Sequence, residues 1–461
     1  MAGVIVVGGG VAGITAALDC ADAGAHVTLV EVRRRLGGAA YSVQRDGLHV
    51  DNGQHVFLRC CLAYRELLAR LGSESRVHVQ ERLEIPVLSP GAPAAVLRRG
   101  SLPAPAHLLG ALARYPRLSP AQRLSAARAA LALRRLGRDT TGAPGRALDR
   151  ETLGAWLARH GQGEEAVHAL WDLIALPTLN LPAAQASLQL GAFVFHEGLF
   201  SRADAADIGF HRATLAEIIG EPAGAALARA GVAVRLGWRA HALARAASGL
   251  ELTGRGGGGE ETLTAQAVVV ALPHTRAAAL IEALLGEVAA RAALLQSSPI
   301  VNLHVVYDRP VLDHAFAAGV RTPVQYLFDR SEAGGVPPGS QYLAVSLSGA
   351  AQEMAMSVDA LRERYLPALR ELLPRARSAR VEQFLVTREH AATFRAVPGV
   401  GALRPGAHTG LPGLVLAGAW TDTGWPATLE GAVLSGHSAA RAALAALELP
   451  PRARAGAAVG S

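Results

Sequence analysis

Lysine is absent from this sequence, and all 45 basic residues are arginines. Cysteine is rare: Cys20, Cys60 and Cys61 form no C-x-x-C pair, which argues against a disulfide scaffold and a structural zinc site. No apolar stretch reaches the roughly 18 residues that a membrane-spanning helix needs, and the opening residues lack the basic region of a signal peptide. We therefore expect a cytoplasmic protein without a metal, and a peripheral position at the inner face of the plasma membrane stays open.

Charged residues are also scarce. They make up 18% of the 461 residues, and half of the chain is hydrophobic, so the protein can bury large cores. The formal net charge is +7, but the arginines are scattered and no zinc-finger or RNA-binding signature accompanies them. The sequence thus predicts no nucleic-acid partner, whereas contact with a membrane surface stays open.

The opening residues, GVIVVGGGVAGITAALDCADAGAHVTLVE, carry the most informative pattern. A β-branched run at 3–7 predicts a buried parallel strand, 11–23 predict an alanine-rich helix, and 26–30 predict a second strand. The turn before the helix reads G-x-G-x-x-G, and an acidic residue ends the second strand. In this setting the motif predicts a dinucleotide-binding turn, although the motif alone would be weak evidence.

Each residue of this motif has a physical role. Gly8 permits the tight turn, Gly10 lets the backbone approach a pyrophosphate at the helix N-terminus, and Gly13 lets the helix pack closely on the strand. Glu31 can accept hydrogen bonds from both ribose hydroxyls of an adenosine. The other residues expected to line this part of the cofactor are Val11, Ala12 and Val32.

The next residues, VRRRLGGAAYSV, favour FAD over NAD. The arginine cluster and the glycine pair resemble the second dinucleotide signature of FAD-dependent oxidases and desaturases. The resemblance implies that Gly37 and Gly38 open a loop along the FAD pyrophosphate, and that Arg33 adds positive charge beside it. A solvated arginine cluster is the alternative.

A polar insert, DNGQH, interrupts the strand-like segment LHVDNGQHVFL. Unpaired burial of these groups would be costly, so the insert marks a turn or a site. Asp51 and Gly53 resemble the Asp-x-Gly element that lies against the flavin in the phytoene desaturase and amine oxidase superfamily. Gln54 and His55 would then contact the cofactor, and His55 could also act on substrate; a purely structural histidine is an equal alternative.

Three later segments bear on the substrate and the cofactor. Residues 102–137 alternate apolar residues and arginine at helical spacing, which suits either a membrane interface or an ordinary packed helix pair. GAFVFHEGLF is expected to form part of an apolar substrate chamber or of a plain core. Segment 232–274 resembles the superfamily's adenine-contacting strand, near Val234, followed by a β-meander and a strand that passes the cofactor at Ala271.

We expect an α/β protein in which a Rossmann-like FAD-binding domain is interleaved with a mixed α+β substrate domain. The predicted cofactor domain comprises residues 1–75, 205–290 and 400–448, and the predicted substrate domain comprises 76–204 and 291–399. The remaining residues, 449–461, are expected to be a disordered tail.

Near the C-terminus, AGAWTDTGWPATLEGAV contains two of the five tryptophans. A helix is expected from Thr428 to about Ala446. Its small residues would let backbone approach a flat ligand, and its N-terminus would face the flavin pyrimidine ring, where reduced flavin is negatively charged. The tryptophans would wall that pocket. The residues predicted to contact the cofactor here are Gly418, Trp420, Asp422, Trp425, Pro426, Ala427, Thr428, Leu429 and Glu430.

Taken together, DNGQHVFL, SPIVNLHVVYDRPV and LAGAWTDTGWPATLEGAVLSGHSAA resemble the squalene-associated FAD-dependent desaturase family, the hydroxysqualene dehydroxylases of bacterial hopanoid synthesis. The resemblance implies reductive removal of an allylic hydroxyl from hydroxysqualene, giving squalene and water, with reduced FAD as the donor. An acid must protonate the leaving hydroxyl, and His55, Asp51 and Asp422 are the candidates. One departure is that Gly418-Ala419 replaces the Gly-Asp that binds the ribityl chain in the superfamily, with Asp422 as a substitute.

Three alternatives stay open. A carotenoid-type desaturase or isomerase shares the fold, the cofactor and an apolar substrate. A flavin amine oxidase shares the fold, but that group commonly places a lysine near flavin N5, and this chain has none. A lipid-binding flavoprotein without turnover is the alternative from outside the enzymes.

Overall fold

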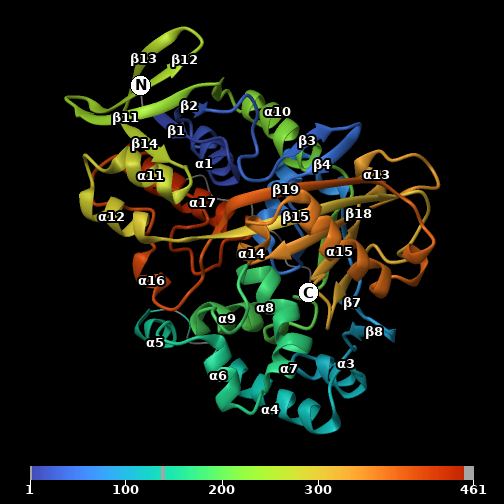
Figure 1. The fold of residues 1–461 in the computed structure, drawn as a ribbon. Helices are drawn as coiled ribbons and strands as arrows, with labels where there is room; N and C mark the ends of the chain where they lie inside the picture. The colour runs from blue at the N-terminus through green and yellow to red at the C-terminus, as the bar shows by residue number, and fades with distance from the viewer. Residues whose placement is uncertain (1–2, 137–139, 141, 451–461) are drawn as a thin grey trace.

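The computed structural model describes residues 3–136, 140 and 142–450 (Figure 1). A parallel sheet with its helices lies toward the top of the view, and a larger mixed sheet and a helical lobe lie below it. The α/β class expected from the sequence is confirmed. Most of the tail predicted at 449–461 lies outside the described residues.

The parallel sheet has five strands in the order β10-β2-β1-β14-β20. These strands are β1 Gly3–Val7, β2 His26–Glu31, β10 Ala233–Leu236, β14 Ala267–Val270 and β20 Leu414–Leu416. The sequences GVIVV and AVVV of β1 and β14 are continuous apolar runs, which is typical of parallel strands covered on both faces. The sheet therefore joins segments from the beginning, middle and end of the chain.

Two helices from opposite ends of the chain pack together beside this sheet. They are α1 Val11–Asp22 and α17 Leu429–Ala446. A Cβ added to Gly436 would lie 2.5 Å from the carbonyl oxygen of Ala12, so only glycine permits this approach of α17 to α1. Helices α10 Glu221–Arg229 and α2 Leu62–Leu71 flank the pair.

A three-stranded antiparallel meander extends from the parallel sheet, at the top of Figure 1. Its strands are β11 Arg239–Ala246, β12 Gly249–Gly256 and β13 Gly259–Ala265. The hairpin tip lies between Gly256 and Gly259, which pair with each other, so the meander predicted from the sequence is confirmed.

The larger sheet has seven strands in the order β19-β15-β18-β17-β16-β7-β8. They are β7 Glu84–Ser89, β8 Ala92–Arg98, β15 Ser297–Tyr307, β16 Phe316–Gly319, β17 Tyr326–Asp329, β18 Gln341–Ser348 and β19 Val381–Phe394. Side chains alternate along β15: Val301 and Leu303 belong to the core that also contains residues of α15 Val358–Leu372. Asn302 points the other way and donates to the backbone of Asn52 in the polar insert.

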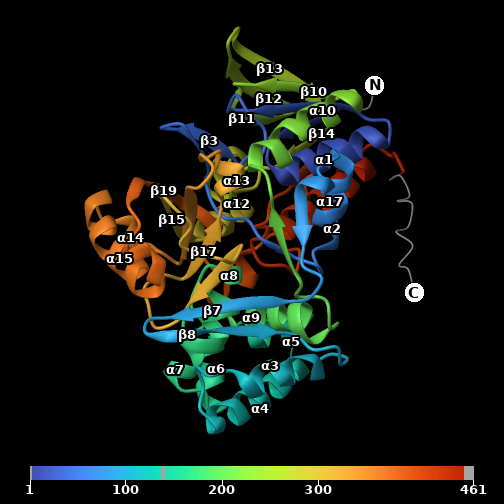
Figure 2. The same ribbon diagram turned by 90° about the vertical axis from the view of Figure 1, so that its right-hand side faces the viewer.

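A helical lobe covers one end of this sheet and lies at the bottom of both views (Figures 1 and 2). Its helices are α3 Leu109–Arg114, α4 Pro120–Leu136, α5 Gly142–Leu148, α6 Leu153–Arg159, α7 Glu164–Ala166, α8 Asp172–Leu179 and α9 Leu188–Phe195. α4 begins at Pro120, where the missing N–H of proline costs no helical hydrogen bond and its fixed φ suits a first helical turn. Within the described ranges, no helix combines the length and apolarity that crossing a bilayer requires.

A small sheet connects the two parts of the molecule. It pairs β9 Ile208–His211 with β5 Phe57–Leu58 on one side and β6 Val77–Val79 on the other. These pairings join β6, from the predicted substrate domain, to β5 and β9 of the predicted cofactor domain. The domain boundaries stay a prediction.

The remaining α-helices and strands are β3 Ser42–Arg45, β4 Leu48–Asp51, α11 His274–Ile281, α12 Gly286–Leu294, α13 Ser331–Gly334, α14 Ala351–Met354 and α16 Val400–Leu403.

Candidate active site

The first glycine motif forms a tight turn between β1 and α1. Gly8 has a φ of +113°, and a Cβ there would lie 2.5 Å from the carbonyl oxygen of Ala271. A Cβ on Gly13 would lie 2.0 Å from the carbonyl oxygen of Gly8. Gly10 differs, since its added Cβ would meet nothing closer than 3.7 Å. The turn therefore tolerates a Cβ at Gly10, directly before the N–H groups of the first turn of α1.

The second glycine motif lies against the first. The backbone N–H of Gly37 donates to Gly9 at 2.9 Å, and a Cβ on Gly38 would lie 2.6 Å from the Cα of Gly10. Arg35 donates to the carbonyl oxygen of Gly38 at 3.2 Å and its guanidinium lies 3.8 Å from the Tyr41 ring centroid. The two glycine signatures thus form one backbone cradle.

Glu31 lies at the edge of this cradle, at the carboxyl end of β2. Its carboxylate is buried and accepts the backbone N–H of Gly9 at 2.6 Å and of Arg33 at 2.8 Å. Val234, on the neighbouring strand β10, pairs with Leu29 of β2. Of the other residues predicted here, Val11 and Ala12 are buried in the first turn of α1, and Val32 is exposed.

The C-terminal motif lies beside the cradle because α17 packs on α1. Thr428 caps α17 by accepting the N–H of Gly431 at 3.1 Å. Trp420 is buried and donates from Nε1 to the carbonyl oxygen of Leu272 at 2.9 Å. The Trp425 ring meets Phe193 of the helical lobe edge to face, with 5.2 Å between centroids. The predicted contact of both tryptophans with the cofactor stays a prediction.

Two acidic side chains of this motif are directed elsewhere. The Glu430 carboxylate is buried and accepts the N–H groups of Ala63 and Tyr64, so it caps the N-terminus of α2; burial raises the pKa of this carboxyl. Asp422 is exposed and accepts the N–H of Gly424 in its own turn. That these two residues contact the cofactor stays a prediction. Gly418 has a φ of +136° and donates its N–H to Ser435. Pro426, Ala427 and Leu429 complete the segment that enters α17.

Arg404 is a buried residue that the sequence did not identify. Its guanidinium donates to the carbonyl oxygens of Trp420, Thr421 and Trp425 and lies 4.7 Å from the Phe394 ring centroid. Burial lowers the pKa of Arg404 to about 10, so the side chain is cationic at neutral pH. Arg404 thus fixes the loop that carries both tryptophans.

The polar insert after β4 is anchored by a buried ion pair. Asp51 accepts hydrogen bonds from Ser42 Oγ at 2.6 Å, from the backbone of Leu215 at 3.0 Å and from Arg330 at 2.8 Å. Arg330 comes from the segment between β17 and α13, and sequence reasoning missed it. All of these donors make Asp51 a positioning residue for the insert.

A cavity of about 420 Å³ opens beside this ion pair. His55 lines it, half buried, and its Nδ1 donates to the carbonyl oxygen of Gly53 at 3.2 Å. His211, hydrogen-bonded to the Tyr64 hydroxyl at 2.8 Å, lines it too. Burial lowers the pKa of both imidazoles, that of His211 to about 3, so both are neutral at pH 7.

Two buried polar atoms beside this insert have no partner within the described part of the chain. They are Nε2 of Gln54 and Oδ1 of Asn302. A Cβ added to Gly53 would lie 3.9 Å from the Asn302 amide nitrogen, so the Asn302 side chain lies beside this glycine, which directly precedes Gln54. Orphaned buried polar atoms are costly, and a polar ligand would satisfy them. This pair and the glycine cradle fit a large dinucleotide cofactor.

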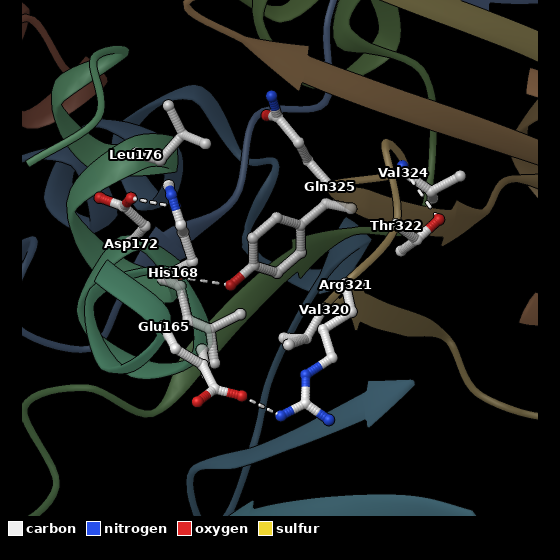
Figure 3. Close-up of a pocket in the computed structure, with 13 residues that line it drawn as sticks. Glu165, His168, Asp172, Leu176, Val320, Arg321, Thr322, Val324 and Gln325 are labelled. Atoms are coloured by element: carbon white, nitrogen blue, oxygen red, sulfur yellow. Dashed lines mark hydrogen bonds and ion pairs between the residues drawn. The ribbon is translucent and has the colours of Figure 1, made fainter. Parts of the chain in front are cut away.

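A second cavity of about 390 Å³ lies between the helical lobe and the large sheet (Figure 3). Glu165 pairs with Arg321 at one side of it, and the Tyr326 hydroxyl donates to the carbonyl oxygen of Leu173 at 2.6 Å. A cluster of stacked or tilted rings contributes to the linings of both cavities, and its members are Phe210, Phe316, Tyr326 and Phe328. Tyr326 lines this cavity, whereas Phe210 and Phe328 line the one beside His55.

The aromatic residues predicted to form an apolar chamber divide between two environments. Phe193 reaches Trp425 of the C-terminal motif. Phe195 and Phe200 are buried in the core with Trp171. The alternative of a plain core therefore holds for these two residues.

Known proteins share this arrangement. Residues 11–444 match the family described as flavin containing amine oxidoreductase. The hydroxysqualene dehydroxylase of Rhodopseudomonas palustris is 32% identical over 450 residues, covering 96% of this chain and 98% of that protein. The zeta-carotene desaturase of Synechocystis is 25% identical over 96% of this chain and 97% of that protein. The cyclohexylamine oxidase of Brevibacterium oxydans superposes with a TM-score of 0.74 at 21% identity, covering 97% of this chain and 99% of that one.

The fold and the glycine cradle define an FAD-dependent oxidoreductase, with FAD as its cofactor. The chain belongs to the flavin containing amine oxidoreductase family, and within it to the group of the hydroxysqualene dehydroxylases. The resemblance inferred from the sequence motifs is confirmed.

Proposed function

We propose that this oxidoreductase removes the allylic hydroxyl of hydroxysqualene reductively, giving squalene and water for hopanoid synthesis. The observation that carries the proposal is the end-to-end similarity to the hydroxysqualene dehydroxylase of R. palustris, at 32% identity across 96% of this chain. The absence of lysine from the whole sequence also disfavours oxidation of an amine by the lysine-assisted chemistry common in the wider family. The substrate is then a small polyisoprenoid.

Reduced FAD, when bound, supplies a hydride to the allylic carbon that loses its hydroxyl. The glycine cradle at Gly8–Gly13 and the N-termini of α1 and α17 would hold the cofactor, because free backbone N–H groups at a helix N-terminus favour anionic groups. Trp425 and Phe193 form an apolar wall beside the C-terminal motif. Such a wall excludes water, which would otherwise capture a carbocation.

Among the residues considered as the acid, we favour His55. Asp51 is held by three donors, one of them the cation Arg330, and Asp422 is exposed in its own turn. His55 faces the cavity and donates from Nδ1 to Gly53, so its Nε2 is the atom left to carry a proton toward the leaving hydroxyl. The protonated form is scarce at pH 7 because burial lowers the pKa of this imidazole.

The test uses the purified protein with its FAD reduced under anaerobic conditions. Hydroxysqualene is added, flavin reoxidation is followed by absorbance, and products are identified by mass spectrometry. We expect reoxidation with one squalene formed per flavin. Reoxidation at the rate seen without substrate, or with no squalene formed, would contradict the proposal.

The similarity to zeta-carotene desaturase supports a second candidate function, the dehydrogenation of a carotene. That reaction runs in the opposite redox direction, since the flavin would be reduced by the substrate. Mixing the oxidised protein with zeta-carotene and observing flavin bleaching would favour the desaturase. A non-catalytic lipid-binding flavoprotein would give only the background change in flavin absorbance in both assays.

A further inference from the structure

The outer face of α4 carries leucine and arginine in alternation. Leu124, Arg128, Leu131 and Arg135 are spaced by four, three and four residues, so they lie on one side of the helix. All four are exposed, and the two leucines retain 55% and 52% of their accessible surface. The opposite face, with Ala126, Ala129 and Leu133 buried, packs into the lobe. The two leucines lie two helical turns apart on one face, and apolar side chains gathered in a patch with a polar rim mark surfaces that bind proteins or membranes.

The neighbouring helix α3 also exposes a leucine and an arginine. α3 contacts α4, and it presents exposed Leu109 and Arg114. Both helices lie at the bottom of the molecule, at the end opposite the meander β11–β13, in two perpendicular views (Figures 1 and 2). We call these six residues the lobe surface: Leu109, Arg114, Leu124, Arg128, Leu131 and Arg135.

The lobe surface contains three arginines and no acidic residue. Residues 85–136 contain eight arginines and no aspartate or glutamate. Within the described ranges, no carboxylate forms an ion pair with Arg114, Arg128 or Arg135, whereas Arg98 and Arg99 pair with Glu84 and Asp207. The charges of the lobe surface are thus available to an anionic partner.

We propose that the lobe surface docks on an anionic phospholipid bilayer, such as the inner face of a plasma membrane. Leucines would enter the boundary between headgroups and acyl chains, and arginines with long apolar stems would reach the phosphates. A second copy of the chain fits poorly, because a two-fold contact would place arginines against arginines without carboxylates. A nucleic acid would leave the leucines without an apolar partner. The proposal does not depend on the reaction assigned to the flavin site.

Docking at this place has a structural consequence. α4 packs on α9, and Phe193 of α9 contacts Trp425 of the C-terminal motif. The lobe that would meet the lipid therefore also walls the cofactor site. A lipophilic substrate dissolved in the bilayer would reach this lobe first.

The test is flotation of the FAD-loaded protein with vesicles of phosphatidylcholine alone or with one quarter phosphatidylglycerol. We expect binding to the anionic vesicles, with loss in high salt. The double variant Arg128→Gln/Arg135→Gln should lower the partition coefficient about 25-fold, because each basic residue near an anionic surface contributes about five-fold. Leu124→Ser/Leu131→Ser should lower it about 10-fold or more.

Matched controls are available on other faces. Arg229→Gln/Arg245→Gln removes two exposed arginines from α10 and β11, and Leu294→Ser removes an exposed leucine from α12. Both should bind vesicles as the unmodified protein does. FAD content and thermal unfolding show whether each variant is folded. If Leu124→Ser/Leu131→Ser is unfolded, the single variant Leu131→Ser is used in its place. The proposal is overturned by absence of binding to anionic vesicles, by equal losses in the controls, or by a dimer in sedimentation that only the leucine variants dissociate.

Discussion

Arg404 donates from Nη2 to the carbonyl oxygen of Trp425 at 2.8 Å, and the same guanidinium also binds the carbonyls of Trp420 and Thr421. A five-donor planar group can hold three carbonyls that no single amide or ammonium could reach together. The tryptophan loop therefore depends on one buried side chain that comes from outside the motif.

Replacing Arg404 by glutamine should loosen this loop without removing the cradle for the FAD phosphates. We expect about 10-fold weaker FAD binding, since two or three hydrogen bonds from a charged donor are lost. Arg404→Lys should recover only part of it, because an ammonium lacks the planar fork. FAD dissociation is measured by flavin fluorescence, with Arg245→Gln as the exposed control. Unchanged affinity in Arg404→Gln would show that the loop does not contribute to cofactor binding.

Gly10 and Gly13 should respond differently to alanine. At Gly13 the new Cβ would lie 2.0 Å from the Gly8 carbonyl oxygen, so we expect a loss of about 3 kcal/mol in the free energy of unfolding even without FAD. At Gly10 the new Cβ would make only an ordinary contact at 3.7 Å from the Cα of Gly38, so Gly10→Ala should fold normally yet bind FAD about 100-fold more weakly, the equivalent of one or two charge-assisted hydrogen bonds.

Gly163 gives a matched control for Gly10. Both residues are helix N-caps with extended backbone, φ −71° against −79°, and a Cβ on Gly163 meets nothing within 4 Å. Gly163→Ala should therefore change neither unfolding nor FAD binding. If Gly10→Ala bound FAD with normal affinity, the turn at the start of α1 would not be the pyrophosphate site.

What could be predicted from the sequence depended on whether the interacting residues are close together or far apart along the chain. The turn at Gly8, Gly10 and Gly13 was predictable because its constraints act between residues close in the sequence, where strand, turn and helix patterns are visible. The role of Glu430 was not, because its carboxylate caps α2 through Ala63, 367 positions away. A helix N-terminus accepts an acid from any segment that the fold brings to it.

Arg404 and Arg330 were missed for a related reason. Among 45 basic residues, nothing local marks Arg404 as buried beside the carbonyls of the tryptophan loop, or Arg330 as the partner of Asp51. Similarly, a phenylalanine-rich helix predicts burial but does not say which ring faces a site; only Phe193 of that segment reaches Trp425. Fold class and cofactor are properties of pattern, whereas individual contacts within a site depend on tertiary structure.

The buried His304 should make stability depend on pH. It is fully buried, bonded to Tyr342 and Thr387, and burial, aided by the charge of Arg45, lowers its pKa to about 3. The unfolded chain protonates this imidazole below about 6.5, whereas the folded chain does not. Stability is thus fully present above pH 6.5 and decreases as the pH falls, by about 2 kcal/mol between pH 7 and pH 5.

Urea unfolding at pH 7 and pH 5 measures this effect. His304→Gln should be less stable at pH 7 but should lose about 2 kcal/mol less than the unmodified protein on acidification. His241→Gln, on the exposed strand β11, serves as the control and should keep the full dependence. An identical loss in His304→Gln and in the unmodified protein would show that His304 does not remain neutral in the folded state.

His55 should set the pH profile of the proposed dehydroxylation. Its imidazole lines the cavity with Nδ1 bound to Gly53, and burial lowers its pKa below 6.5, so the acid form grows as the pH falls. We expect the rate of reoxidation of the reduced flavin by hydroxysqualene to rise about 10-fold per pH unit between pH 8 and the pKa of His55. His55→Gln should lower the rate at pH 7 by about 100-fold and leave a flat profile, while FAD binding is retained.

His78 is an exposed histidine at the same cavity and serves as the control. His78→Gln should keep both the rate and its slope with pH. A sloping profile that persists in His55→Gln would assign the proton to another titratable group at this cavity, which is also lined by His211, Asp329 and Glu332.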